Sequence, residues 1–109
     1  AAPRSAGKRW IAGSLKPKGA LGVDDGAQRA LRDGRSLLPV GVATVTGRFE
    51  RGDLVTLRTG DGFEIGRGLC AYSSDDAARI AGHKTSEIEK ILGYRGRDEI
   101  IHRDDLVLD

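Results

Sequence analysis

The amino-acid sequence predicts a mainly β domain with short helices, arranged as a small mixed barrel. The 109 residues include sixteen glycines, a composition that favours many turns and short strands over a helix bundle. Three short helical patterns interrupt the strand patterns without the strand–helix–strand alternation of a parallel α/β sheet. The helices are therefore expected to decorate a barrel rather than to cover both faces of an open sheet.

The size and composition indicate one globular domain. Apolar residues make up 39% of the chain and charged residues 31%, proportions typical of a folded protein. No apolar run approaches the roughly 20 residues of a membrane helix, so no membrane partner is expected. The N-terminus lacks an apolar signal core. A single cysteine, Cys70, excludes an internal disulfide and a multi-cysteine zinc site and is compatible with a reducing cytoplasm.

Charge is distributed unevenly along the chain. The first 20 residues carry five basic and no acidic side chains, whereas the other 89 carry 13 basic and 16 acidic ones. We interpret residues 1–8 as a linker or expression remnant and residues 9–109 as the domain. Because the sequence contains no methionine, we expect it to be a piece of a longer protein. The basic arm, residues 1–20, weakly indicates nucleic-acid binding, and the alternative interpretation is a solvated linker.

The first elements are a strand over residues 19–23 and a helix over residues 27–32. Asp24 or Asp25 is expected to cap the helix, and Gly34 to end it. The stretch 36–42, Ser-Leu-Leu-Pro-Val-Gly-Val, then connects this helix to the next strand. Because the stretch is strongly apolar, we expect it to lie under the fold. Gly41 predicts either unusual backbone angles or a close approach that a Cβ would block.

The middle of the sequence predicts a β-hairpin. Residues 42–46 are β-branched, and residues 54–58 alternate between apolar and polar side chains. An Asp-Gly pair in the turn 59–62 is a strong hairpin signal, and the return strand runs from residue 63 to about 71. Gly66 and Gly68 within it suggest a bulge or bend.

The last third predicts two helices and two closing strands. Residues 73–76 are expected to cap a helix that runs to about Ala81. Ser86 and Glu89 have the spacing of a capping box for a second helix, which Gly93 ends. Residues 100–102 and 106–108 are read as closing strands.

No catalytic, cofactor-binding or metal-binding residue is predicted in this chain. Gly66-Arg67-Gly68-Leu69-Cys70-Ala71 matches a dinucleotide fingerprint, but its glycines lie in a hairpin strand rather than before a helix. His102-Arg103-Asp104 matches part of a protein-kinase catalytic loop without the asparagine and glycine-rich loop that accompany it. Two histidines without ligand spacing make a weak metal site. We expect a turn with a local His–carboxylate or Arg–carboxylate contact at residues 102–104.

An ordered set of short sequence blocks spans residues 9–108. The blocks are Arg9-Trp10-Ile11-Ala12-Gly13, Asp24-Asp25-Gly26-Ala27 with Ala30-Leu31, Ser36-Leu37-Leu38-Pro39-Val40-Gly41-Val42, Phe49-Glu50-Arg51-Gly52-Asp53, Gly66-Arg67-Gly68-Leu69, Tyr72-Ser73-Ser74, Leu92-Gly93-Tyr94 and Ile101-His102-Arg103-Asp104-Asp105-Leu106-Val107. By their order and spacing, these blocks resemble the C-terminal PUA domain of bacterial glutamate 5-kinases.

The resemblance implies a PUA pseudo-barrel of mixed or antiparallel strands. It also implies a longer parent chain, a cytoplasmic homo-oligomeric kinase that makes L-glutamyl 5-phosphate from L-glutamate in the first step of proline synthesis. ATP and Mg would be used by the kinase domain of that parent, which this sequence does not include. PUA domains bind RNA through the first helix, the following loop and the last strand. By position, this implies Arg32, Arg35, Gly41 and Arg103 as candidate RNA-binding residues.

Three hypotheses for function follow. The first is a non-catalytic PUA domain of glutamate 5-kinase with a regulatory or assembly role, partnered by the kinase domain of its own chain. The second is a free-standing RNA-binding PUA protein, and the third an unrelated barrel used for protein contacts. The acidic balance outside the arm and the scarcity of aromatic side chains predict that any RNA binding is weak.

Overall fold

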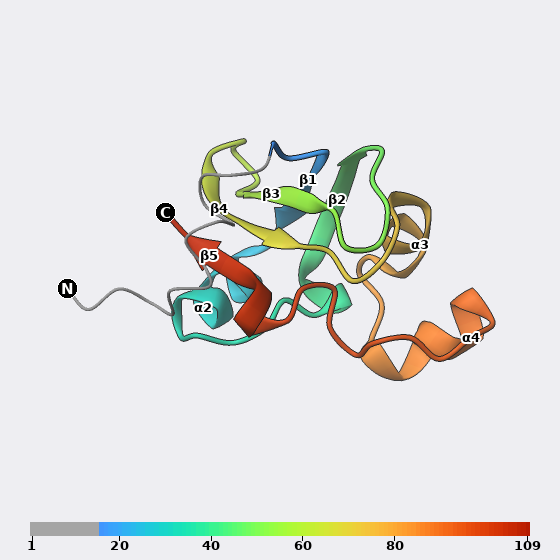
Figure 1. The fold of residues 1–109 in the computed structure, drawn as a ribbon. Coiled ribbons are helices and arrows are strands. Elements are labelled where there is room, and N and C mark those ends of the chain that lie inside the picture. Colours follow the sequence, from blue (N-terminus) through green and yellow to red (C-terminus); the bar gives the residue numbers. More distant parts are fainter. Residues whose placement is uncertain (1–15) are drawn as a thin grey trace.

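The computed structural model describes residues 16–109, whose five strands form one sheet in the order β2-β1-β3-β4-β5 (Figure 1). The strands are β1 Gly19–Val23, β2 Val42–Gly47, β3 Leu54–Arg58, β4 Glu64–Leu69 and β5 Leu106–Leu108. β1 and β3 are parallel and the other neighbours are antiparallel. The predicted mainly β fold with mixed strands and short helices is confirmed. The linker 1–8 and the basic residues Arg4, Lys8 and Arg9 lie outside the described residues.

A backbone bridge brings together the segments that lead into the two edge strands. The Leu37 N–H donates to the Ile101 carbonyl at 2.9 Å, and the Ile100 N–H donates to the Leu37 carbonyl at 2.8 Å. Leu37 comes shortly before β2 and Ile101 shortly before β5, so this contact closes the sheet into a pseudo-barrel. The predicted strand 100–102 is therefore wrong: only Ile101 pairs, because the chain turns at once into the 3₁₀ helix η4, Arg103–Asp105.

The hairpin between β3 and β4 turns at the predicted Asp-Gly pair. Gly62 has a φ of +91°, and the Thr59 N–H donates to the Phe63 carbonyl at 2.9 Å. The pairing shifts where Leu57 faces Gly66 and Arg58 faces Glu64, so the bulge lies at Ile65. Gly66 itself serves close packing on β5, since a Cβ there would come within 2.5 Å of the Val107 carbonyl oxygen.

Both faces of β3 are buried. Val55 and Leu57 belong to the main hydrophobic core, yet Leu54 and Thr56 are also only 2% and 5% exposed. The predicted polar–apolar alternation of residues 54–58 is therefore wrong as a guide to exposure. Pairing with β1 and β4 satisfies the two edges of β3, whereas burial of both faces requires other parts of the chain to cover the sheet, and the strand's own residue pattern does not report them.

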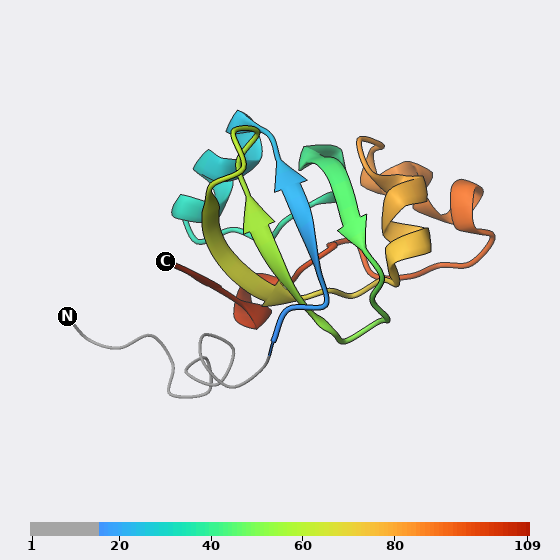
Figure 2. The same ribbon diagram turned by 90° about the horizontal axis from the view of Figure 1, so that it is seen from above.

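The helices gather at two sides of the barrel. α3 (Ser74–Ile80) and α4 (Ile88–Leu92) lie together beside β2, whereas α2 (Asp25–Arg32) lies on the other side of the molecule (Figure 2). The hydroxyl of Ser73 caps α3 by accepting from the Asp76 N–H at 3.3 Å, as predicted.

The capping prediction for the next helix is wrong. The chain first forms the 3₁₀ helix η3 (Thr85–Glu87), so the side-chain cap lies two residues earlier than predicted. Glu87 Oε1 accepts from the Lys84 N–H at 3.2 Å, which is one half of a capping box, in place of a Ser86–Glu89 pair. Gly93 ends α4 with a φ of +81°, as predicted.

Candidate nucleic-acid interface

Helix α2 positions the first of the predicted arginines. Asp24 Oδ1 accepts a hydrogen bond from the Ala27 N–H at 2.7 Å and starts the helix, and Gly34, with a φ of +83°, follows its end. Leu31 is 2% exposed and anchors the helix in the core. Its burial directs the next side chain, Arg32, to the surface near the end of the helix.

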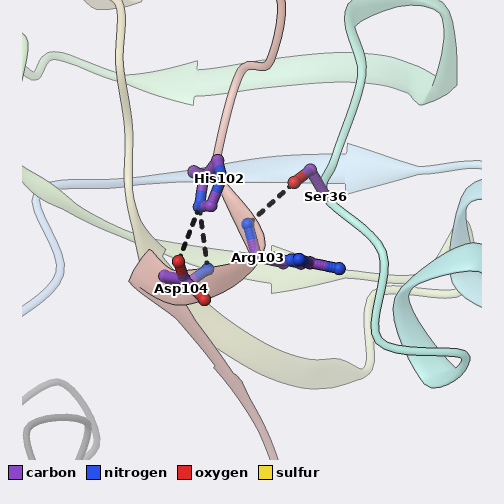
Figure 3. Close-up of polar contacts among 4 residues, drawn as sticks. All are labelled: Ser36, His102, Arg103 and Asp104. Carbon is purple, nitrogen blue, oxygen red and sulfur yellow. Dashed lines mark hydrogen bonds and ion pairs between the residues drawn. The ribbon is translucent and has the colours of Figure 1, made fainter.

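Residue 103 reaches the same surface from the other end of the chain. The Arg103 N–H donates to Ser36 Oγ at 2.8 Å, and this bond lies just beyond the Leu37–Ile101 bridge (Figure 3). The Asp104 N–H donates to His102 Nδ1 at 3.1 Å, and Asp104 Oδ2 lies 3.5 Å from the same nitrogen. The local His–carboxylate contact predicted for this turn is confirmed. In Figure 3 the Arg103 side chain extends away from His102 and Asp104.

Three of the four predicted residues line one hollow. Arg32, Arg35 and Arg103 surround a hollow of about 390 Å³, which we call the α2 hollow. Leu31, Leu106 and Leu108 contribute apolar surface to it, and Asp104 adds one carboxylate. Guanidinium groups donate paired hydrogen bonds that match phosphate oxygens, so the hollow has the chemistry of a phosphate-backbone contact.

Gly41 lines a different hollow from Arg32 and Arg103. It lines an adjacent groove of about 380 Å³ together with Ala27, Leu38 and Val40, and Arg35 borders both hollows. A Cβ at Gly41 would lie 2.6 Å from the Ala27 Cβ, so close approach to α2 explains this glycine. Its φ is not positive, so a glycine is not needed at this position for an unusual backbone conformation.

The stretch 36–42 is not buried as a whole, contrary to the prediction. Leu37 and Val42 are buried, but Leu38 and Val40 are 43% and 51% exposed. The 3₁₀ helix η2 (Pro39–Gly41) turns these two side chains outward while Pro39 and Gly41 pack inward. The sequence signal that reveals this is Pro39, because a proline at the start of a short helical turn breaks a continuous buried strand.

The other motifs singled out in the sequence have structural explanations. Gly66 and Gly68 both lie inside β4, so the helix that a dinucleotide fingerprint needs does not follow them. Burial raises the pKa of the Cys70 thiol to about 11, which keeps it protonated and unreactive at neutral pH. Within residues 16–109, no three His, Cys, Asp or Glu side chains are grouped as a metal site requires. A search of the same residues for a long apolar helix able to cross a membrane found none.

Comparison with known proteins places this geometry in a family. The profile of the PUA domain family matches residues 19–92. The chain is 61% identical to glutamate 5-kinase of Paramagnetospirillum magneticum over 98% of its own length and 29% of that protein. It is 60% identical to glutamate 5-kinase of Rhodopseudomonas palustris (strain BisB18) over 97% of its length and 28% of that protein. The chain thus spans a little over a quarter of the curated relatives that it matches.

Solved structures agree with the fold. A PUA domain from Aeropyrum pernix K1, in a tartrate complex, is 24% identical and matches with a TM-score of 0.57 over 78% of this chain and 41% of its own. The archaeal box H/ACA sRNP Nop10–Cbf5 complex contains a chain that is 16% identical and matches with a TM-score of 0.53 over 79% of this chain and 25% of its own. The five-stranded pseudo-barrel and the family match together show that this chain belongs to the PUA domain family.

Proposed function

We propose that this chain is the non-catalytic, C-terminal PUA domain of a glutamate 5-kinase. The observation that carries the proposal is an identity of 61% that covers nearly the whole chain but only 29% of the relative. The remaining part of the parent chain would be the kinase domain. It would use ATP and Mg to phosphorylate the γ-carboxylate of L-glutamate, in the cytoplasm, in the first step of proline synthesis.

The residues of the domain support a non-catalytic role. The glycines that resemble a nucleotide loop lie inside a strand, where their N–H groups belong to the sheet. The only described cysteine is buried, and His102 is engaged with the backbone of its own turn. A phosphoryl-transfer site needs a loop that cradles phosphates and carboxylates that hold Mg. We assign both to the kinase domain, and to the PUA domain a role in regulating or assembling a homo-oligomeric parent enzyme.

The test compares three proteins in one assay: the longer parent chain, the parent without the segment 9–109, and the 109-residue chain. ATP-dependent formation of L-glutamyl 5-phosphate is measured together with oligomeric state by light scattering. We expect activity in the first two proteins, with altered kinetics or assembly in the second, and none in the third. Phosphate transfer by the 109-residue chain, or an upstream gene sequence without a kinase domain, would overturn the proposal and favour a free-standing PUA protein.

A second candidate function is weak RNA binding at the α2 hollow. The observation that favours it is the convergence of Arg32, Arg35 and Arg103 on one hollow from segments about 70 residues apart in the chain. A structural neighbour belongs to a ribonucleoprotein complex, which supports the same use of the fold. Candidate RNA contacts are thus Arg32, Arg35 and Arg103, with Gly41 shaping the adjacent groove.

Single substitutions test this second function. Arg32→Gln and Arg103→Gln are each expected to weaken binding of a single-stranded RNA about five- to tenfold, since each removes a charge-assisted phosphate contact. Arg58→Gln is the matched control, because Arg58 is exposed at the end of β3 and lines neither hollow. Equal affinity of all four proteins for the RNA would show that the α2 hollow takes no part in binding.

A further inference from the structure

A second group of arginines surrounds a hollow that the proposed function does not use. Arg51, Arg95 and Arg97 line a hollow of about 390 Å³ whose floor is the segment 69–72. We call it the Tyr72 hollow, after the buried ring beneath it. It shares no lining residue with the α2 hollow, and η4 separates the two, with Asp104 in one and Asp105 in the other.

The backbone that carries Arg95 and Arg97 is held in place. The hydroxyl of the buried Tyr72 donates to the Arg97 carbonyl, and Gly96 packs so closely on this ring that a Cβ would come within 2.4 Å of the hydroxyl oxygen. The neighbouring Tyr94 hydroxyl donates to Asp76 Oδ2 at 2.6 Å. The loop therefore presents its two arginines from a fixed backbone, which lowers the entropy lost when a ligand binds.

Arg51 faces this loop from a turn that is equally constrained. The Gly52 N–H donates to the Cys70 carbonyl at 2.7 Å, Gly52 has a φ of +94°, and the Glu50 N–H donates to Asp53 Oδ2 at 2.8 Å. On the other side of the same floor, the Ala71 N–H donates to the Ile100 carbonyl at 2.7 Å. Residues 70–72 thus lie between the two arginine-bearing segments.

Basic side chains outnumber acidic ones around the Tyr72 hollow. Of its lining residues only Asp105 is acidic, against three arginines. Among the nearby carboxylates, Asp98 lines the hollow beside α4, which Arg95 also lines, Glu99 lines the Gly41 groove, and Asp76 is bonded to Tyr94. Across the part of the chain that the structure describes, the ion pairs found involve Arg67, His83 and His102 and none of these three arginines.

We propose that the Tyr72 hollow binds a phosphate group, carried by a nucleotide or by an RNA chain. Three guanidinium groups without carboxylate partners repel one another, and a phosphate dianion relieves that repulsion while accepting paired hydrogen bonds. The ring of Tyr94 lines the same hollow and is 45% exposed, so it offers a face on which a base attached to the phosphate stacks. This site is independent of RNA binding at the α2 hollow.

The test is an amide NMR titration of the 109-residue chain with inorganic phosphate, adenosine 5′-monophosphate and a uridine hexamer without terminal phosphates. Gly52 and Gly96 report on the Tyr72 hollow, and Gly34 reports on the α2 hollow. We expect shifts at Gly52 and Gly96 with the monophosphate, and weaker binding of phosphate alone. Shifts at these glycines with the hexamer but not with the monophosphate would identify the RNA backbone as the source of the phosphate.

Substitutions of opposite sign separate binding from misfolding. Arg51→Gln and Arg97→Gln are each expected to weaken binding about tenfold. Asp105→Asn removes the carboxylate of the hollow and is expected to tighten binding about two- to fivefold. Arg58→Gln and Arg32→Gln are expected to leave the shifts at Gly96 unchanged. No shift at Gly52 and Gly96 with any probe, or shifts that persist in Arg51→Gln and Arg97→Gln, would overturn the proposal whatever the α2 hollow does.

Discussion

At the scale of single residues, Gly41 couples helix α2 to the turn before β2. Its carbonyl accepts from the Asp24 N–H at 3.0 Å, and its missing side chain leaves room for the Ala27 Cβ. We expect Gly41→Ala to lower the free energy of unfolding by about 1–3 kcal/mol through overpacking, and Gly41→Val to lower it further. Chemical denaturation measures the change.

Two further substitutions show whether the contact with Ala27 is the cause. Gly60→Ala is the matched control, because a Cβ there meets no atom within 4 Å and the backbone φ is not positive. Combining Gly41→Ala with Ala27→Gly is expected to recover part of the loss, since it removes the opposing methyl group. If the two changes add without any recovery, the glycine is required for a reason other than this contact.

At the scale of elements, local signals predicted what short stretches of chain decide by themselves. The Asp24 cap, the Gly62 turn and the Gly93 stop each depend on the chemistry of a few adjacent residues. The errors arose where neighbours in space decide. Leu54 is buried because both faces of β3 are covered, and Leu38 is exposed where the chain turns into η2 directly after it. Neither position in the fold is visible in the local pattern.

The contact between Tyr94 and Asp76 joins the end of α4 to the first turn of α3 and gives stability a pH dependence. The hydrogen bond to the Asp76 carboxylate is the main reason that the pKa of Tyr94 is raised from 10.0 to about 12. A raised pKa in the folded state means that the neutral hydroxyl is favoured by folding. The hydrogen bond therefore contributes its full stabilisation of the folded state below pH 10, and this stabilisation is lost as the pH rises from about 10 to about 12.

The comparison of Tyr94→Phe with the unsubstituted chain isolates this effect. The phenylalanine variant is expected to be less stable at pH 8, by at most about 1 kcal/mol because the pair is exposed to solvent, and the difference should shrink toward pH 12. Burial raises the pKa values of Cys70 and Tyr72 as well, but both groups are present in the two proteins, so most of their contribution cancels in the difference. A difference in urea midpoint that stays constant with pH would assign the loss to packing of the ring.

At the scale of the whole molecule, barrel closure creates the α2 hollow. Arg32 and Arg103 lie about 70 residues apart in the sequence and line one hollow because Leu37 pairs with Ile101. No periodicity or spacing reports such a contact, so only the family resemblance joined Arg103 to Arg32. The same resemblance joined Gly41 to them, whereas the structure places it in a neighbouring groove. The Tyr72 hollow escaped prediction because Arg51 and Arg97 meet only across segment 70–72.

The balance of charge over the whole chain determines how RNA binding should respond to salt. The described residues carry 15 basic and 16 acidic side chains, while three further basic residues lie before residue 16. Binding that depends on a few phosphate contacts releases counterions, so affinity should fall as salt is added. For each phosphate that the protein neutralises, the logarithm of affinity should fall by about 0.7 for a tenfold increase in salt concentration. Sequence preference should be small, because the chain has only five aromatic side chains with which to stack bases.

A salt titration with several unrelated RNAs measures this slope, with and without residues 1–8. Removing that segment deletes Arg4 and Lys8 and should reduce the slope by about 0.7 for each of these residues that contacts a phosphate. Arg32→Gln should reduce it by a similar step if the α2 hollow holds a phosphate. Tight binding to one RNA that persists at high salt and without the arm would contradict this expectation. It would mean that the Gly41 groove and Arg103 recognise particular bases, since contacts to base edges and stacked rings release few counterions.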